Sequence, residues 1–203
     1  MARKFAQIAF TPAVKAMQTH YGSREIYTRF ENGGTANDQI NPDIAAFIAA
    51  RDGFYMGTTS SDGWPYIQFR GGQPGFLKVL DERTLGFADF QGNLQYISVG
   101  NLSTDDRVFL FLMDYAHRRR LKIWGRATVI EHDPELLAAV VDPDYPAEVG
   151  RAVLIHVEAW DWNCPQHIPL RYSEAEVNAM VTPLQNRILQ LEAQLADRQS
   201  SES

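Results

Sequence analysis

The alternation of apolar and polar residues predicts a chain built mainly of short β-strands after residue 53. Segments rich in aromatic and β-branched residues are separated by turn sequences such as Ser61-Asp62-Gly63 and Asp81-Glu82-Arg83-Thr84. Such segments are typical of strands, and the tight turns between most of them favour antiparallel pairing. The predicted strands cover residues 54–60, 66–70, 76–80, 85–90, 108–114, 121–130 and 152–160.

Apolar residues with helical spacing predict several helices around these strands. Thr11-Pro12, Asn41-Pro42 and Asp133-Pro134 each place a capping side chain before a proline, which suits the first helical position. A further short helix is predicted to begin near Asn93, after the turn residues Gln91-Gly92.

The C-terminal segment has a different pattern. Leu184, Ile188, Leu191 and Leu195 recur at spacings of four, three and four residues, the seam of an amphipathic helix or a short coiled coil. Because this repeat spans fewer than two heptads, we expect the helix to pack on its own barrel or on a partner subunit.

These elements predict a mainly β chain of the α+β class, with helices at its periphery. Closing the antiparallel sheet into a small barrel would remove its exposed edges. No linker rich in proline, glycine or serine divides the sequence, so we expect one domain over residues 1–203. Within it, residues 1–53 form a helical N-terminal region, 54–170 the barrel and 171–203 a C-terminal helical extension.

Composition narrows the function classes. Apolar residues make up 45% and charged residues 22% of the sequence, as in ordinary globular proteins. A net charge of −6 argues against a general nucleic-acid binder, and no apolar run is long enough to span a bilayer. The sequence has one cysteine, Cys164, and no recognisable secretory signal, so we expect a cytoplasmic protein without an internal disulfide.

Two clusters have the residue types of an anion site. Arg70 ends a predicted strand and is followed by Gly71-Gly72, which places a planar cation beside a backbone that a ligand can approach closely. In Asp89–Asn93, a strand runs into a glycine turn and a predicted helix start, which can also bind an anion. Each cluster also has an ordinary structural interpretation. The first can be a glycine-rich hairpin with an exposed arginine, and in the second Asn93 can be a simple N-cap.

A third cluster, residues 160–169, combines tryptophans with Cys164 and His167. Zinc needs three or four ligands, and no second Cys/His pair has suitable spacing, so we predict no metal site. A Cys–His nucleophile is also not supported, because Pro165 fixes a turn between the two side chains. The segment is either a loop that packs aromatic side chains or a polar and aromatic wall beside a flat ring.

In this order, the three clusters resemble the pyridoxamine 5′-phosphate oxidase-like family of FMN-binding split-barrel proteins, and most closely its predicted flavin-nucleotide-binding branch. The resemblance covers roughly residues 40–170. It is carried by residues 61–66, by Gln68-Phe69-Arg70-Gly71-Gly72, by 74–77, by Asp89-Phe90-Gln91-Gly92-Asn93, by Gly100-Asn101-Leu102, by Gly125-Arg126-Ala127 and by 161–168. The family implies a six-stranded split barrel, a homodimer, and FMN bound at the subunit interface.

The resemblance also implies which residues contact the flavin. One set comes from the chain that holds the phosphate, and a second set, Gln166 and His167, comes from the partner subunit. The first set is Gln68, Phe69, Arg70, Gly71, Asp89, Phe90, Asn93, Asn101 and Arg120. Arg120 stands where the oxidase has a glutamine. The oxidase's C-terminal substrate-binding arginine motif is absent from the sequence, so the resemblance does not imply oxidation of pyridoxamine phosphate.

We therefore expect an FMN-binding protein that acts as an oxidoreductase on a small molecule, with the flavin performing the chemistry and no catalytic residue assigned. An alternative is a flavin-binding or sensing module without turnover. Another is a split barrel that uses heme or a deazaflavin, with His156 or His167 as the candidate heme ligand. Its expected partners are a second copy of the chain and a small-molecule substrate or electron donor, with no nucleic acid and no membrane.

Overall fold

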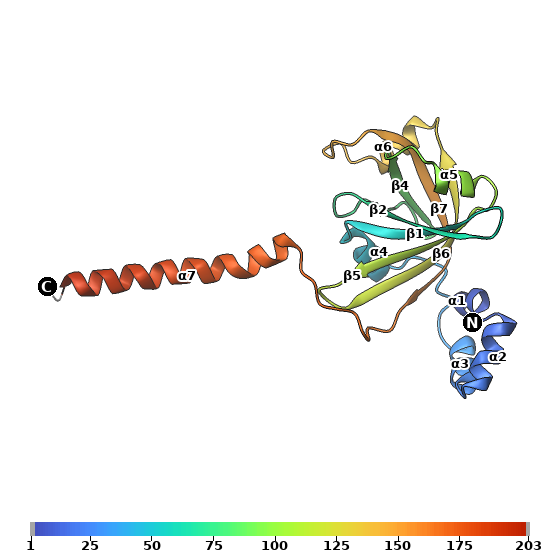
Figure 1. Cartoon of the computed structure of the whole chain (residues 1–203), viewed down its shortest axis with the longest axis horizontal. Helices are drawn as coiled ribbons and strands as arrows, with labels where there is room; N and C mark the ends of the chain where they lie inside the picture. Colours follow the sequence, from blue (N-terminus) through green and yellow to red (C-terminus); the bar gives the residue numbers. More distant parts are fainter. Residues whose placement is uncertain (1–2, 202–203) are drawn as a thin grey trace. The chain divides into compact units, whose positions relative to one another are not determined.

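The computed structural model describes residues 3–201, which form two compact units. The first runs to Pro165 and omits Tyr115–Arg118. The second consists of Tyr115–Arg118 and of the chain from Gln166 onward. The first unit contains the sheet and most of the helices, and it is described first (Figure 1).

Seven antiparallel strands form a single sheet, so the predicted α+β fold with antiparallel strands is confirmed. Their order across the sheet is β2-β1-β5-β6-β7-β4-β3. The strands are β1 Gly53–Thr59, β2 Pro65–Gly71, β3 Lys78–Val79, β4 Thr84–Phe90, β5 Arg107–Asp114, β6 Arg119–Ile130 and β7 Val149–Trp162. The count matches the seven strands that the hydrophobic pattern predicts and exceeds by one the six that the family resemblance implies; of residues 76–80, only Lys78 and Val79 form β3 and pair with β4.

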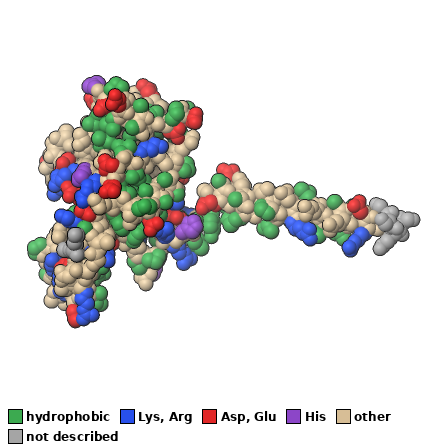
Figure 2. Space-filling model, turned by 180° about the vertical axis from the view of Figure 1, so that it is seen from behind, with side chains coloured by type: hydrophobic (Ala, Val, Ile, Leu, Met, Phe, Trp, Pro, Cys, Tyr) green, Lys and Arg blue, Asp and Glu red, His purple; other side chains and the backbone are tan. Residues whose placement is uncertain are grey.

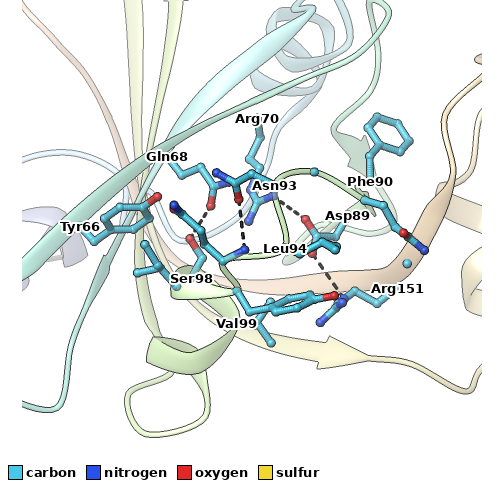
Figure 3. Close-up of a pocket in the computed structure, with 16 residues that line it drawn as sticks. Tyr66, Gln68, Arg70, Asp89, Phe90, Asn93, Leu94, Ser98, Val99 and Arg151 are labelled. Carbon is cyan, nitrogen blue, oxygen red and sulfur yellow. Dashed lines mark hydrogen bonds and ion pairs between the residues drawn. The ribbon is translucent and has the colours of Figure 1, made fainter.

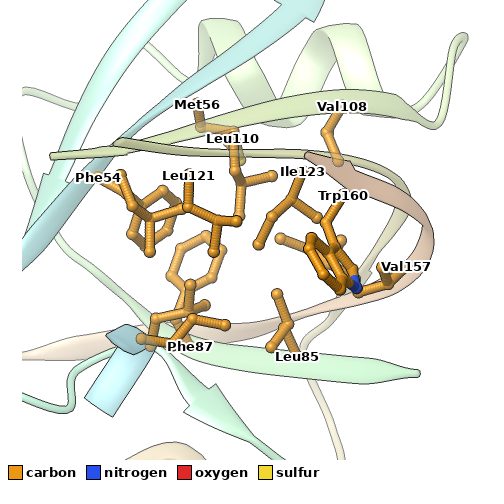
Figure 4. Packing of buried hydrophobic residues seen from close by; sticks show 14 of the residues in the cluster. Phe54, Met56, Leu85, Phe87, Val108, Leu110, Leu121, Ile123, Val157 and Trp160 are labelled. Atoms are coloured by element: carbon orange, nitrogen blue, oxygen red, sulfur yellow. The ribbon is translucent and has the colours of Figure 1, made fainter. Parts of the chain in front are cut away.

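The sheet curls around an apolar core. Alternation along each strand turns every second side chain inward, so Phe54 of β1 and Phe87 of β4 meet with ring centroids 5.3 Å apart. Figure 4 shows core side chains of β1, β5 and β6 facing those of β4 and β7. Among the described strands, none of the backbone pairings joins β2 to β3 or β4, so the barrel is split between these strands.

Helices cover the ends and one side of the barrel. Thr11, Asn41 and Asp133 each accept a hydrogen bond from the backbone N–H three residues later, which confirms the three predicted helix starts. The helices of the first unit are α1 Lys4–Ala9, α2 Pro12–His20, α3 Arg24–Asn32, α4 Pro42–Ala49, α5 Ile97–Leu102 and α6 Pro134–Val140. The first and third of these were not predicted; Phe5 of α1 packs on Trp124 with ring centroids 5.0 Å apart.

The helix predicted to begin near Asn93 begins instead at Ile97. Leu94 and Tyr96 have positive φ angles of 60° and 53°, which a right-handed helix cannot contain. The Asn93 side chain accepts a hydrogen bond from the Gln95 N–H at 3.2 Å and stabilises a turn rather than the helix start.

The second unit contains one long helix, α7 Glu174–Ser201. It includes the predicted C-terminal helix and extends beyond the Leu184–Leu195 pattern at both ends. Pro183 lies inside it. Among the described residues, no helix combines the length and the apolar character that crossing a membrane requires.

Candidate functional site

A pocket of the first unit lies where the barrel is split. It has a volume of about 220 Å³ and is lined by β2, β4, the 91–96 loop, α5 and the start of β7. The two strands on either side of the split therefore contribute side chains to one concave site. Figure 3 shows these side chains pointing toward one another across the pocket.

One wall of the pocket comes from alternate residues of β2. Tyr66, Gln68 and Arg70 line the pocket, because residues two apart on a strand share a face. The Gln68 side-chain oxygen accepts a hydrogen bond from the Ser98 hydroxyl of α5 at 2.8 Å. This bond joins α5 to the edge strand and fixes the amide within the pocket.

Three charged side chains meet at the split between β2 and β4. Nη1 of Arg70 on β2 lies 2.5 Å from Oδ1 of Asp89 on β4. Asp89 is paired with Arg151 across β4 and β7, and Nε of Arg151 lies 3.5 Å from its Oδ2. The three side chains are only 13%, 8% and 14% exposed, in chain order. Two guanidinium groups therefore share one carboxylate, and the group has one net positive charge.

Burial shifts the ionisation of this group. Removal from water lowers the pKa of Arg70, although Asp89 and Tyr66 oppose the change and the guanidinium stays charged at neutral pH. Burial likewise raises the pKa of Asp89 above its ordinary value of 3.8, against the opposing effect of the two arginines.

Each arginine also has an unmatched donor. The Nε–H groups of Arg70 and Arg151 are buried and form no hydrogen bond among the described residues, although Nε of Arg151 lies at ion-pair distance, 3.5 Å, from Oδ2 of Asp89. A buried donor without an acceptor is costly, and most are paired in native proteins. The chemistry of this donor set fits an anionic group with several acceptor oxygens, such as a phosphate.

The rest of the pocket is formed by a loop with an unusual backbone. Leu94 and Tyr96 in this loop have left-handed conformations, and the Arg151 guanidinium lies over the Tyr96 ring at 5.1 Å from its centroid. Non-glycine residues in this conformation cost energy and cluster at ligand sites. The loop thus presents backbone and one aromatic ring to the charged group.

The model of the family described as pyridoxamine 5′-phosphate oxidase matches residues 40–162, more than half of the chain. The chain belongs to this family. The match spans the whole sheet from β1 to β7 and leaves out α1–α3 and α7. The resemblance expected from the sequence is therefore confirmed.

Solved structures show the same fold. HupZ of Group A Streptococcus matches with a TM-score of 0.51 and 14% identity, over 66% of this chain and 99% of that protein. A substituted form of HupZ also gives 0.51, with 13% identity over 61% and 99%. An FMN-binding protein of Syntrophomonas wolfei has 7% identity and a TM-score of 0.47, over 72% and 97%. Identities this low show the fold alone. The sequence matches none of the curated proteins.

Within this family fold, five of the predicted flavin-contacting residues line the pocket together. They come from β2, from β4 and from the loop after β4: Gln68, Arg70, Asp89, Phe90 and Asn93. The two clusters that the sequence separates by about twenty residues thus meet at the split. Whether they contact a flavin stays a prediction.

Four other predicted residues lie outside the pocket lining. Gly71 lies directly against the Phe69 ring: a Cβ at position 71 would be 2.7 Å from that ring. Asn101 is buried and donates a hydrogen bond to the Thr58 hydroxyl at 2.9 Å. Arg120 lies opposite Met113 on the β5–β6 hairpin.

The two residues expected from the partner subunit belong to the second unit. His167 has a positive φ of 62° and Gln166 precedes it at the start of that unit. Their contribution to a flavin site stays a prediction.

The lining residues that sequence reasoning missed include Tyr66, Ser98 and Arg151. Tyr66 could have been found from strand alternation, since it lies two and four residues before Gln68 and Arg70. Arg151 could not, because its place beside Asp89 depends on the register between β4 and β7.

Proposed function

We propose that this chain binds FMN, with the phosphate held between Arg70 and Arg151, and that it is a flavin-dependent oxidoreductase acting on a small molecule. The observation that carries the proposal is the pair of buried arginines that share the single carboxylate of Asp89 and whose Nε–H groups form no hydrogen bond to any described residue. Membership of the pyridoxamine 5′-phosphate oxidase family supports it.

Electrostatics favours a phosphate in this pocket. The charged group has one uncompensated positive charge, and it is mostly removed from water, where charge-assisted hydrogen bonds are strong. Glu131 lies 3.7 Å from Arg151 but is 56% exposed and outside the pocket lining, so it screens the arginine only weakly.

The size of the pocket limits what it encloses. Ligand sites for drug-sized molecules occupy about 300–1,000 Å³, so a pocket of about 220 Å³ suits the phosphate-bearing end of FMN and leaves its ring outside. When bound, FMN supplies hydride or electron transfer at its ring. The chain's own groups bind and orient it: the two arginines hold the phosphate, and the Gln68 amide N–H group, oriented by the Ser98 hydroxyl, offers a neutral hydrogen bond beside it.

We also propose that the barrel is a homodimer whose second subunit covers the flavin ring. The outward face of β1 and β2 supports this, because Ile67, Phe69 and Tyr55 are 67%, 57% and 41% exposed. Neighbouring exposed apolar side chains on a sheet are typical of an interaction surface.

The pocket also bears on the alternative cofactors. Heme iron is held by a histidine, cysteine, methionine or, less often, tyrosine, and of these residue types the described lining of the pocket contains tyrosine alone, as Tyr66 and Tyr96. A deazaflavin with a phosphate group would use the same arginines, so the absorbance spectrum and the mass of the released ligand distinguish it from FMN.

The test is the flavin content of the purified chain. We expect a yellow protein that releases FMN on denaturation, or that becomes yellow after incubation with FMN. Arg70→Gln and Arg151→Gln should lower the flavin-to-protein ratio, whereas Arg126→Gln on the exposed side of β6 should not. A protein that stays colourless in the presence of FMN would contradict the proposal.

Turnover is tested separately. Rapid mixing of the FMN-loaded protein with NADH or NADPH, followed by a screen of electron acceptors, should show bleaching and recovery of the flavin absorbance. Persistent inertness with every donor would favour the flavin-binding or sensing module over an oxidoreductase.

A further inference from the structure

The helix α7 has an apolar seam that its own unit leaves uncovered. Figure 1 shows α7 as one long helix, and Figure 2 shows hydrophobic side chains spaced along it. None of the described residues of the second unit buries these side chains, which are 38% to 64% exposed. They are Val177, Val181, Leu184, Ile188, Leu191 and Leu195.

The seam is longer than the leucine pattern alone indicates. Because α7 begins at Glu174, Val177 and Val181 extend the pattern toward its start. The spacing is then four, three, four, three and four, which is the alternation of d and a positions in heptads. A strict seven-residue repeat of this kind is typical of left-handed coiled coils.

The identity of the seam residues indicates the number of strands. Val181 and Ile188 are β-branched and occupy a positions, whereas Leu184 and Leu191 occupy d positions. At the centre of the seam this combination favours parallel two-stranded coiled coils over trimers and tetramers, and the exceptions, Val177 at d and Leu195 at a, lie at its two ends.

The charges beside the seam indicate its direction. Arg187 occupies a g position and Glu192 the e position five residues later. In a parallel, in-register pair, each g residue faces the e residue of the next heptad in the partner. Arg187 of each helix would then face Glu192 of the partner subunit, which gives two attractive pairs.

An antiparallel pair gives no such attraction. There, g positions face g positions and e positions face e positions, so Arg187 would face Met180, Gln194 or a second arginine. Glu192 would face an asparagine, a glutamine or a second glutamate. Within one helix, Arg187 contacts Gln190 at 3.4 Å, and Glu192 is too far along to pair with it.

We propose that α7 forms a parallel, in-register, two-stranded coiled coil with α7 of a second copy of this chain. Pro183 occupies a c position, on the side away from the seam, and removes one backbone donor there. The tightest part of the coil therefore begins at Leu184. If the barrels also dimerise, they would hold the two short helices at a high effective concentration. The coiled-coil proposal itself rests on the seam and its charges and does not depend on flavin binding.

Disulfide cross-linking of the full chain tests the proposal. In a Cys164→Ser background, Leu184→Cys places identical thiols opposite each other in a parallel pair, so mild oxidation should produce a covalent dimer. Ile188→Cys should do the same and replaces the first variant if that one folds poorly. The matched control, Asn186→Cys, lies at an f position that faces away and should stay monomeric on a non-reducing gel.

Each other outcome overturns the proposal. In the antiparallel pair that overlaps the whole seam, Leu184 would lie opposite Ile188, so a mixture of Leu184→Cys and Ile188→Cys chains would cross-link and neither variant alone would. No cross-link at any seam position would mean that the helix packs on its own barrel or on nothing. Equal cross-linking at 184 and 186 would mean random collision.

A charge exchange tests the register. Arg187→Glu in the Leu184→Cys background should reduce the cross-linking rate, and adding Glu192→Arg to the same chain should restore it. Failure of the second change to restore the rate would contradict the proposed pairing. Flavin content measured on the same samples separates the coiled-coil proposal from the flavin proposal. A colourless chain that cross-links at Leu184→Cys overturns only the flavin proposal.

Discussion

A buried hydrogen bond between Asn101 and Thr58 leads us to predict a structural role for Asn101. Asn101 was expected to contact the flavin, but its side-chain amide donates to the Thr58 hydroxyl at 2.9 Å, and the two residues are 8% and 3% exposed. The bond joins α5, which carries Ser98 of the pocket, to β1. We therefore predict that Asn101→Ala lowers stability rather than removing a direct flavin contact.

The magnitude follows from burial. Asn101→Ala loses one hydrogen bond and leaves a buried hydroxyl without its donor, which together cost about 2 kcal/mol. Thr58→Val strands the amide instead and should cost a similar amount. The double variant leaves neither group stranded, so its loss should also be about 2 kcal/mol rather than the additive sum of about 4 kcal/mol.

Urea unfolding of the flavin-free chain, followed by circular dichroism, measures all four free energies of unfolding. A coupling energy of about 1–2 kcal/mol between the two substitutions supports the structural role. Additive losses would refute the reasoning, because they would mean that the two side chains act independently. A weakened FMN affinity in Asn101→Ala with unchanged stability would restore Asn101 as a flavin ligand.

Two further predictions concern the barrel wall and its exposed charges. Gly125→Ala should lower stability by about 3 kcal/mol in thermal unfolding, because its Cβ would lie 2.6 Å from the His156 carbonyl oxygen. Gly100→Ala, whose Cβ meets nothing within 4 Å in α5, should be neutral or gain up to about 1 kcal/mol; equal losses would contradict this. Hydrogen bonds from Arg107 lower the pKa of Asp105 from 3.8 to about 2, so its stabilisation is complete above about pH 4 and is lost as the pH falls toward 2. The stability gap between wild type and Asp105→Asn should therefore close over that range, and a gap independent of pH would show that the carboxylate charge is not involved.

Much of the fold follows from local patterns. Strand alternation and capping residues predict the antiparallel sheet and the starts of three helices, including Asn41 with Pro42. The start of α5 was missed because the left-handed conformations of Leu94 and Tyr96 are unusual for those residue types. Pairing between distant segments decides such conformations, and no local pattern contains it.

The pocket was predictable in its parts but not in its geometry. Arg70 and Asp89 were recognised as separate clusters, and their meeting across the split depends on how the sheet curls. Arg151 was missed because its register on β7 is a tertiary property. Phe69 faces away from the pocket because it alternates with Arg70 on the same strand, which the sequence pattern did contain.

The most direct test of the central claim compares FMN with riboflavin, which lacks the phosphate. Quenching of flavin fluorescence gives the Kd of each ligand for the wild type and for Arg151→Gln. We predict that the wild type binds FMN at least about tenfold more tightly than riboflavin, since a charge-assisted hydrogen bond contributes about 1.5–3 kcal/mol. Arg151→Gln should weaken FMN by a similar factor and leave riboflavin unchanged. Equal affinity of the wild type for both flavins, or equal weakening of both by the substitution, would contradict a phosphate site between Arg70 and Arg151.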